Sequence, residues 1–259
     1  MKITSLLENT TARADMLVEH GLSLYIETES HRILFDMGQT DLFYENAITL
    51  GIDLATVDIA ILSHGHYDHG GGLRKFLEIN SHAPVYIHKD AFLPHYNGTE
   101  KYIGLDPALQ DHPQIVFTND EYRISDALTL FSCNDRVKGH PTIPSGLTEK
   151  AGEVFLPDDF RHEQYLRMEE NGKQVLISGC SHKGILDITE WFKPDVLIGG
   201  FHYSKLPLDE ALAAAAKSLA AHSTVFFTCH CTGCAQYEFM RQYVPSLHYL
   251  SCGQTISVS

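Results

Sequence analysis

The sequence contains few cationic side chains: 19 Lys and Arg residues stand against 33 Asp and Glu residues, which gives a formal net charge of −14. A nucleic-acid backbone repels such a chain, so we expect no nucleic-acid partner. The sequence also lacks any apolar run near the roughly 20 residues of a membrane-spanning helix, so we expect no membrane partner. Residues 1–8 lack the long apolar stretch of a signal peptide, which predicts a cytoplasmic protein.

Two common catalytic motifs are also missing. The sequence has no Gly-x-Ser-x-Gly nucleophile elbow, and the glycines at 70–72 are not followed by the Lys-Ser/Thr of a P-loop. There is no internal repeat or low-complexity linker, and 44% of the 259 residues are hydrophobic, which indicates a single globular domain. We interpret the six cysteines as thiols or metal ligands rather than as disulfides.

Short apolar segments predict strands. The segments 21–28 and 32–36 flank a polar turn, as in a hairpin, and Asn171-Gly172 predicts the turn of a second hairpin. The predicted strands are residues 21–28, 32–36, 57–62, 164–168, 173–178, 195–200 and 224–228. The predicted helices are residues 41–50, 71–79, 183–192, 207–222 and 235–244, the fourth with Leu208, Leu212 and Leu219 on one apolar face. Hairpins followed by strand–loop–helix units indicate an α/β fold of mixed sheets covered by helices. We interpret the range 91–157, richer in Pro, Gly, Asn and Asp, as an insertion or substrate-side lobe.

A dense cluster of polar residues follows the predicted strand that ends at Leu62: His64, His66, Asp68 and His69. Residues on one face of a helix are three or four apart, so we expect a tight loop, with Gly65 and the glycines at 70–72 supplying unusual backbone angles. Imidazole and carboxylate ligands suit one or two zinc ions, with iron and manganese as alternatives. A polar turn with surface histidines is the simpler interpretation, but three histidines and an aspartate in six residues make it a poor one.

Residues 63–73, Ser-His-Gly-His-Tyr-Asp-His-Gly-Gly-Gly-Leu, resemble the His-x-His-x-Asp-His signature of metallo-β-lactamase-fold hydrolases. The resemblance implies a four-layer αββα sandwich with the metals at one edge, between the two sheets. The segments 178–185, 199–202 and 229–233 resemble one branch of that superfamily, the dihydropterin ribofuranosyl-aminobenzene-phosphate synthases. The name of that branch implies a pterin condensation.

Further candidate ligands follow two later strands. His182 comes after the strand ending at Ser178, and His230, which matches the final histidine of the family, comes after the strand ending at Thr228. Many members of the superfamily carry a bridging aspartate where this chain has Cys180. A Cys180 thiolate could bind zinc or iron, or the residue could be an inert buried cysteine that leaves a site for one metal.

His202, at the end of another predicted strand, is a candidate for contact with substrate or with a ligand, and a core histidine is the alternative. Asn9 and His20 carry a weaker resemblance, and we do not expect them to be ligands. The Cys-x-x-Cys pair at 231 and 234 lacks a partner pair at zinc-finger spacing, so we do not expect a structural zinc there.

Three functions share these residues. The first is hydrolysis of an ester, thioester or phosphate by metal-bound hydroxide, in which Asp68 ligates a metal and orients the hydroxide. In this hypothesis Lys183 or His202 meets an anionic group of a small-molecule substrate. The second is a pterin-related transferase, in which the metals activate a diphosphate leaving group. The third is a non-catalytic metal-binding sensor. The sequence makes no prediction of oligomeric state.

Overall fold

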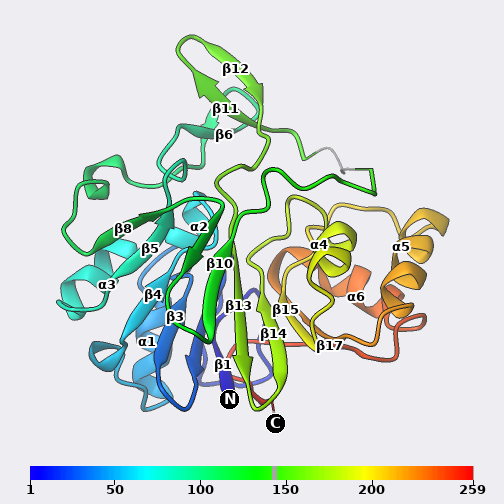
Figure 1. The fold of residues 1–259 in the computed structure, drawn as a ribbon, viewed down its shortest axis with the longest axis horizontal. Coiled ribbons are helices and arrows are strands. Elements are labelled where there is room, and N and C mark those ends of the chain that lie inside the picture. The colour runs from blue at the N-terminus through cyan, green and yellow to red at the C-terminus, as the bar shows by residue number, and fades with distance from the viewer. Residues whose placement is uncertain (142–144, 259) are drawn as a thin grey trace.

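Two seven-stranded sheets face each other in the computed structural model, which describes residues 1–141 and 145–258 (Figure 1). The first sheet has the strand order β18 (Thr255–Ser257), β1 (Lys2–Leu7), β2 (Ser23–Glu27), β3 (Arg32–Phe35), β4 (Ile59–Ile61), β5 (Val85–His88) and β8 (Ile115–Thr118). The second has the order β17 (Leu247–Tyr249), β16 (Val225–Thr228), β15 (Val196–Gly199), β14 (Lys173–Ile177), β13 (Tyr165–Glu170), β10 (Leu128–Phe131) and β9 (Glu121–Arg123).

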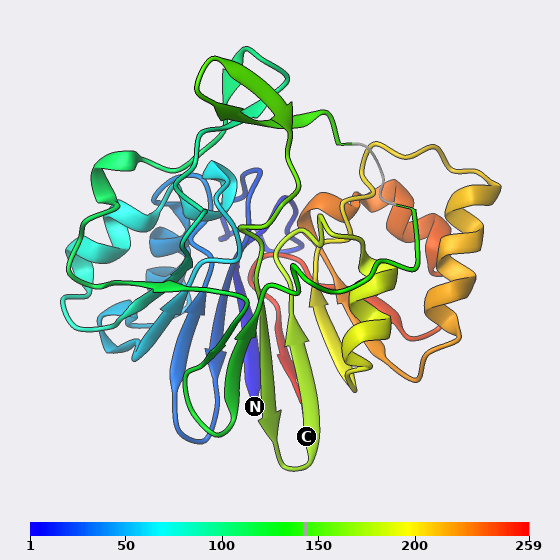
Figure 2. The same ribbon diagram turned by 45° about the horizontal axis from the view of Figure 1, so that its top comes forward.

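Helices cover the outer face of each sheet, which gives the four αββα layers visible in Figure 2. The first sheet is covered by α1 (Leu42–Thr49) and α3 (Leu73–Ile79). The second is covered by α4 (Ile185–Phe192), α5 (Glu210–Ala220) and α6 (Cys234–Met240). The predicted α/β class and the sandwich are therefore confirmed.

Alternation along the strands explains the layers. On β3, Ile33 and Phe35 belong to the apolar core between the sheets, whereas Leu34 belongs to the core beneath α1 and α3. On β14, Leu176 packs toward α4 and α5 while its two neighbours face the other sheet. Successive side chains of a strand point to opposite faces, so strands that are apolar on both faces can be buried on both.

The two predicted hairpins are present. β2 pairs antiparallel with β3, and β13 pairs antiparallel with β14 across the turn at Asn171-Gly172, where both residues have positive φ. The helix predicted from residue 207 instead begins at Glu210, because Asp209 accepts hydrogen bonds from the first backbone N–H groups. Leu208 therefore precedes α5 and is 50% exposed, so its predicted place on the buried face is wrong. None of the described helices combines the length and apolar character that a membrane span needs.

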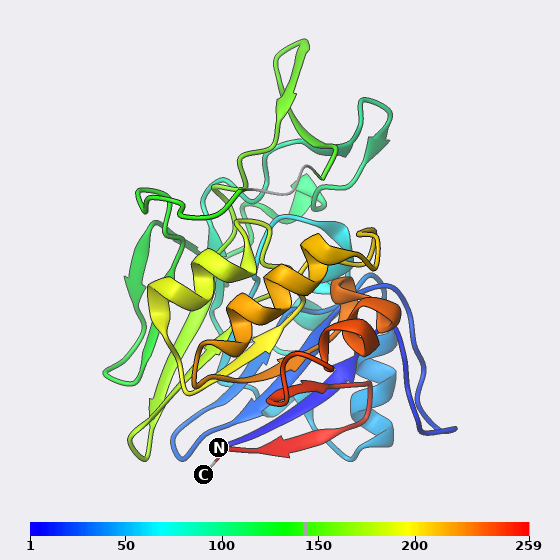
Figure 3. The ribbon, with the colours of Figure 1, turned by 90° about the vertical axis from the view of Figure 1, so that its right-hand side faces the viewer.

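A third, four-stranded sheet stands apart from the two main sheets (Figure 3). Its order is β12 (Val154–Pro157), β11 (Leu147–Ala151), β6 (His95–Asn97) and β7 (Lys101–Tyr102). All four strands lie within the range 91–157, but β8, β9 and β10 of the same range belong to the main sheets. Residues 142–144 of this range lie outside the described residues.

Candidate metal centre

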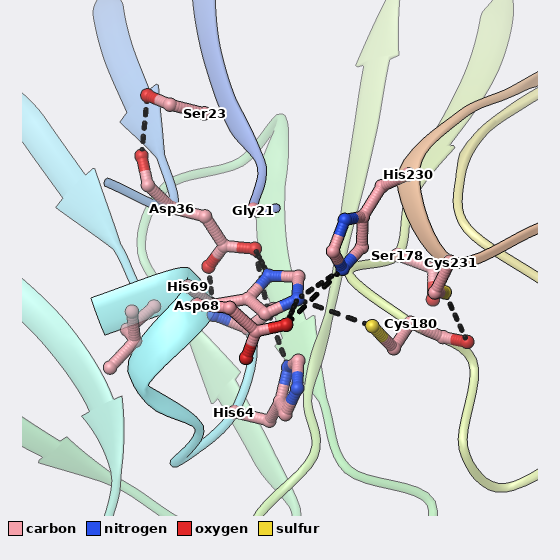
Figure 4. Close-up of polar contacts among 12 residues, drawn as sticks. Gly21, Ser23, Asp36, His64, Asp68, His69, Ser178, Cys180, His230 and Cys231 are labelled. Atoms are coloured by element: carbon pink, nitrogen blue, oxygen red, sulfur yellow. Dashed lines mark hydrogen bonds and ion pairs between the residues drawn. The ribbon is translucent and has the colours of Figure 1, made fainter. Parts of the chain in front are cut away.

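The candidate site lies where three strands end at one edge of the sandwich. The histidine cluster follows β4, the turn at residues 178–182 follows β14, and His230 follows β16. β14, β15 and β16 are parallel neighbours, so their carboxyl ends lie side by side. Figure 4 shows side chains from all three segments pointing at one another: His64, Asp68, His69, Cys180 and His230.

The cluster is not a loop throughout. His64 lies in a bend and His66 has extended backbone, but Tyr67–Gly70 forms a single helical turn, α2, with His66 as its N-cap residue. The expectation of a loop is therefore wrong for Asp68 and His69. The change from extended to helical backbone at His66 lets adjacent residues reach one cavity without the spacing of a regular helix.

The glycines of the cluster permit close packing rather than unusual backbone angles. Gly71 and Gly72 have φ of −62° and −77°, which any residue can adopt. A Cβ added at Gly71 would lie 2.1 Å from the Gln39 carbonyl oxygen, and one at Gly65 would lie 2.1 Å from that of Ala91. The predicted role in backbone angles is wrong, because the neighbouring backbone comes too close for any side chain.

His64, His66 and His182 form one candidate ligand set, in which one nitrogen of each ring lies within 4.8 Å of the others. Nε2 of His64 and both ring nitrogens of His182 are buried and have no hydrogen-bond partner among the described residues. Burial, followed by repulsion from neighbouring histidines, lowers the pKa of each of the three well below its ordinary value. For His66 too, burial is the largest cause. The rings are therefore neutral, the state that binds metal.

Asp68, His69 and His230 form a second set. The His69 and His230 Nε2 atoms are 3.2 Å apart, and Asp68 Oδ2 lies 3.4 Å from His230 Nε2 and 3.9 Å from His69 Nε2. Burial would raise the pKa of Asp68, but His69, His20 and His230 hold it well below its ordinary value. The carboxylate is therefore ionised and available to a cation.

Cys180 lies between the two sets. Its Sγ is 3.2 Å from His69 Nε2, and it belongs to a group with His64 and His69 whose ligand atoms lie within 4.8 Å. Burial raises the pKa of this thiol, so without a cation it is protonated. A bound metal would deprotonate it.

Three buried carboxylates, which the sequence analysis did not select, hold the segments that carry the candidate ligands. Asp36 accepts hydrogen bonds from Ser63 N (2.7 Å), Ser63 Oγ (2.7 Å) and His69 Nδ1 (2.7 Å). Glu163 accepts from the backbone N–H of His182 (2.7 Å). The remaining segment is held by Glu8, which accepts from the backbone N–H of His230 (2.6 Å).

Hydrogen bonds also fix which ring nitrogen faces the centre. Ser63 Oγ donates to Asp36, so it accepts from His64 Nδ1 (2.7 Å), and the lone pair of His64 is left on Nε2. His230 Nδ1 likewise donates to Asn9 Oδ1 (2.8 Å). Asn9, which the sequence analysis did not expect to be a ligand, thus orients one. His20, also not expected to be a ligand, is more than half exposed and places its Nε2 3.2 Å from Asp68 Oδ2.

Asp36, Ser181, His202 and His230 all have φ between 47° and 59°, a region that residues other than glycine rarely adopt. Each lies in or beside the segments just described. Backbone strain of this kind persists where the surrounding structure enforces it, and it concentrates at functional sites. At His230 the surrounding structure includes the buried Glu8, which accepts the backbone N–H of that residue.

The site opens into a cavity of about 270 Å³. Its walls include His66, Asp68, Cys180, His182 and His230, together with Lys101, His202 and Lys205. The ring of His202 lies 4.3 Å from that of His182, centroid to centroid. Of the two alternatives for contact with an anionic group, Lys183 does not line this cavity. Its side chain is buried, and Nζ donates to the carbonyl oxygens of Ser132 and Glu163 (2.6 and 3.1 Å).

We expect the stability of the metal-free protein to depend on His69. Burial lowers the pKa of His69, but Asp36 and Asp68 outweigh that effect and raise it to about 9. The protonated ring therefore contributes stability below pH 6.5, and this contribution, about 3 kcal/mol, is lost as pH rises through about 9. Urea unfolding of chelator-treated protein would show this loss, which His69→Gln should lack. Equal pH dependence in both proteins would contradict the assignment.

Comparisons with known proteins agree with this geometry. A family model described as the metallo-beta-lactamase superfamily matches residues 17–221. An uncharacterized protein of Methanocaldococcus jannaschii is 30% identical over 211 residues, 76% of this chain and 78% of that protein. A second protein of that organism, named 7,8-dihydropterin-6-methyl-4-(beta-D-ribofuranosyl)-aminobenzene-5'-phosphate synthase, is 29% identical over 266 residues, 92% of this chain and 90% of its own. A crystal structure named Tm1679, a metal-dependent hydrolase of the beta-lactamase superfamily, has a TM-score of 0.84 and 29% identity, and the match covers 100% of this chain and 99% of that one.

Proposed function

Because the chain belongs to the metallo-beta-lactamase superfamily, we propose that it is a metal-dependent hydrolase of a small anionic substrate. His64, His66 and His182 would hold one divalent ion, and Asp68, His69 and His230 a second, with Cys180 between them. Zinc suits these ligands, and iron and manganese are alternatives. Each ion would supply a Lewis acid and a water acidified toward neutral pH.

One observation carries this proposal: the unpartnered nitrogens of His64 and His182 are buried beside each other. Burying a polar atom without a hydrogen bond is unfavourable, by about 1–3 kcal/mol. A metal ion, which binds a lone pair at about 2 Å, would satisfy such a nitrogen. The chemistry of the donors therefore fits a bound cation.

The residues of the chain then have distinct tasks. Asp68 accepts a hydrogen bond from the attacking water and keeps it oriented, since its carboxylate is ionised and reaches the cavity. Asp36 holds His69 and, through Ser63, His64 in the tautomer that presents Nε2. His202 lies in the cavity beside His182, where it would contact the substrate.

Two lysines are evidence that the substrate is anionic. Lys101 and Lys205 line the cavity, although the chain as a whole carries a formal net charge of −14. Lys101 donates from Nζ to the hydroxyl of Tyr67 (3.2 Å), which also lines the cavity. Cations at the mouth of a cavity raise the local concentration of anions and steer them inward.

The second candidate is a transferase that joins a pterin diphosphate to an aminobenzene ribosyl phosphate. The observation in its favour is the relative named as a synthase of that kind, which is 29% identical and aligns with 92% of this chain. Hydrolase and transferase would share every ligand, so geometry does not separate them.

Product analysis separates the two. Purified protein would be incubated with a phosphodiester, a thioester and a lactone, and in parallel with a pterin diphosphate and the aminobenzene ribosyl phosphate. The hydrolase proposal predicts consumption of a single substrate with uptake of one water. It is wrong if the pair is joined with release of diphosphate while no single substrate is consumed.

We expect Cys180→Ala to reduce occupancy of the second metal position and Cys180→Asp to retain or raise it. The reason is the 3.2 Å separation of Sγ and His69 Nε2, which places the thiol among the candidate ligands. Metal equivalents would be measured by elemental analysis, with Cys229→Ala as the matched control, since Cys229 is also fully buried but packs in the core between the sheets. Equal stoichiometry in the wild type and Cys180→Ala would show that the thiol is not a required ligand.

A further inference from the structure

A buried polar network lies directly behind His66, outside the two candidate ligand sets. It consists of His95, on the first residue of β6, Asp158, just after β12, and His162. Both histidines have 0% relative exposure, and Asp158 has 8%. The rings of the two histidines lie 4.0 Å apart between centroids and are tilted by 37°. A nitrogen or oxygen of each of the three residues lies within 4.8 Å of a ring nitrogen of His66. The network therefore connects the four-stranded sheet, through β6 and the residue after β12, to the histidine cluster.

The hydrogen bonds of this network determine where its protons lie. The backbone N–H of Gly65 donates to His162 Nδ1 (2.9 Å), so the proton of that ring is on Nε2, which donates to Asp158 Oδ2 (3.4 Å). His95 Nδ1 donates to the same oxygen (2.8 Å). Burial raises the pKa of Asp158, but the two histidines hold it well below its ordinary value, so the carboxylate is ionised and accepts both hydrogen bonds.

One lone pair in the network is unused. His95 donates through Nδ1, so its lone pair is on Nε2, and this atom is buried with no hydrogen-bond partner among residues 1–141 and 145–258. His66 Nε2 is buried and unpartnered in the same way. The two rings are nearly perpendicular, at 78°, with centroids 5.7 Å apart. An N–H on one ring and a lone pair on the other would satisfy both atoms, directly or through one water.

The same four residues have the composition of a metal site, but the hydrogen bonds made by His162 and Asp158 disfavour a metal there. A metal bound at His162 Nε2 would require the proton of that ring to move to Nδ1. There it would face the N–H of Gly65, which already points at Nδ1. The carboxylate oxygen is also occupied by two N–H donors. The network is therefore complete without an ion, apart from the lone pair of His95.

We propose that His95, held by Asp158, is a positioning residue for His66: its Nε2 accepts the Nε2–H of His66, directly or through one water, and so leaves the Nδ1 lone pair of His66 for the metal. His66 lines the cavity, so its remaining nitrogen is the one available there. This inference rests on the proposed function, because it assigns the support of one ligand of the proposed centre. A residue that hydrogen-bonds to a metal-ligating histidine makes that histidine a stronger base, and its loss weakens metal binding about 10–100-fold.

The test compares metal affinity in variants of His95 by competition with a chelator, and the absorption of the cobalt(II) form. His95→Gln keeps a donor for Asp158 and an acceptor for His66, and it should stay within a few-fold of wild type. His95→Asn reaches only Asp158, and it should bind metal about 10–100-fold more weakly, with a shifted cobalt spectrum. His88→Asn is the matched control, because His88 is 1% exposed and its Nδ1 accepts the backbone N–H of Asp90 (3.2 Å), away from the candidate ligands. Its metal affinity should not change.

Three results would overturn the inference. Wild-type affinity and spectrum in His95→Asn would show that His66 needs no support. Loss of one whole metal equivalent in His95→Asn, with the others unchanged, would show that the network is itself a metal site. Wild-type protein that binds no metal would overturn the proposed function as well, whereas the first two results would leave it standing.

Discussion

Asp68→Asn should reduce turnover about a hundredfold or more while the fold stays intact. The substitution keeps the shape of the side chain but removes the negative charge that His69, His20 and His230 stabilise. Without that charge the second set loses its anionic ligand, and the attacking water loses the acceptor that orients it. Turnover would be measured on whichever substrate the product analysis identifies, and the fold by circular dichroism.

The matched control for this variant is Asp106→Asn. Asp106 is exposed, pairs with Arg74 at the surface and does not line the candidate site. Wild-type turnover is expected for the control. If Asp68→Asn also turned substrate over at the wild-type rate, the proposed role of Asp68 would be wrong, although the fold assignment would stand.

Asp36→Ala should be the most destabilising single change in the site, by about 3–5 kcal/mol, with metal binding about 10–100-fold weaker. Asp36 is 0% exposed and accepts three hydrogen bonds, from Ser63 N, Ser63 Oγ and His69 Nδ1. Removing it leaves these donors buried without an acceptor and frees both His64 and His69 to rotate. Urea unfolding and chelator competition would measure the two effects.

Asp58→Ala is the control for this second prediction. Asp58 also accepts a backbone N–H, from Arg32 (2.8 Å), just before β4, but it is exposed to water. We expect a cost of about 1 kcal/mol or less and unchanged metal affinity. Similar losses of stability and of metal affinity in the two variants would show that Asp36 does not hold the candidate ligands in place.

The sequence predicted those parts of the fold that have local signals. The apolar run before Leu62 became β4, and Asn171-Gly172 became the turn between β13 and β14. The sequence did not predict that β1 pairs with β18, where Lys2 lies opposite Ser257. It also did not predict that β8, β9 and β10, within a range that resembles an insertion, belong to the main sheets. Pairings between distant segments depend on the packing of the whole domain and have no local pattern.

The candidate ligands were selected from the sequence because they cluster and follow strands, and the structure brings them together. The buried carboxylates that hold these ligands in place were not selected from the sequence. Asp36, Glu163 and Glu8 are isolated acidic residues in the sequence, and their role depends on burial beside backbone N–H groups of distant segments. The only signal was the position of Asp36 at the end of a predicted strand, residues 32–36. Lys183 follows a candidate ligand, yet its side chain turns toward Ser132, because the direction of a side chain depends on the turn that carries it.

Elemental analysis of protein purified without added metal would show whether the two candidate ligand sets bind metal. We expect one or two equivalents of a transition metal in the wild type. A His64→Ala/His182→Ala double variant, folded by circular dichroism, should lose metal. Wild-type protein that is free of metal yet turns over its substrate would contradict the account, as would a double variant with the full wild-type metal content.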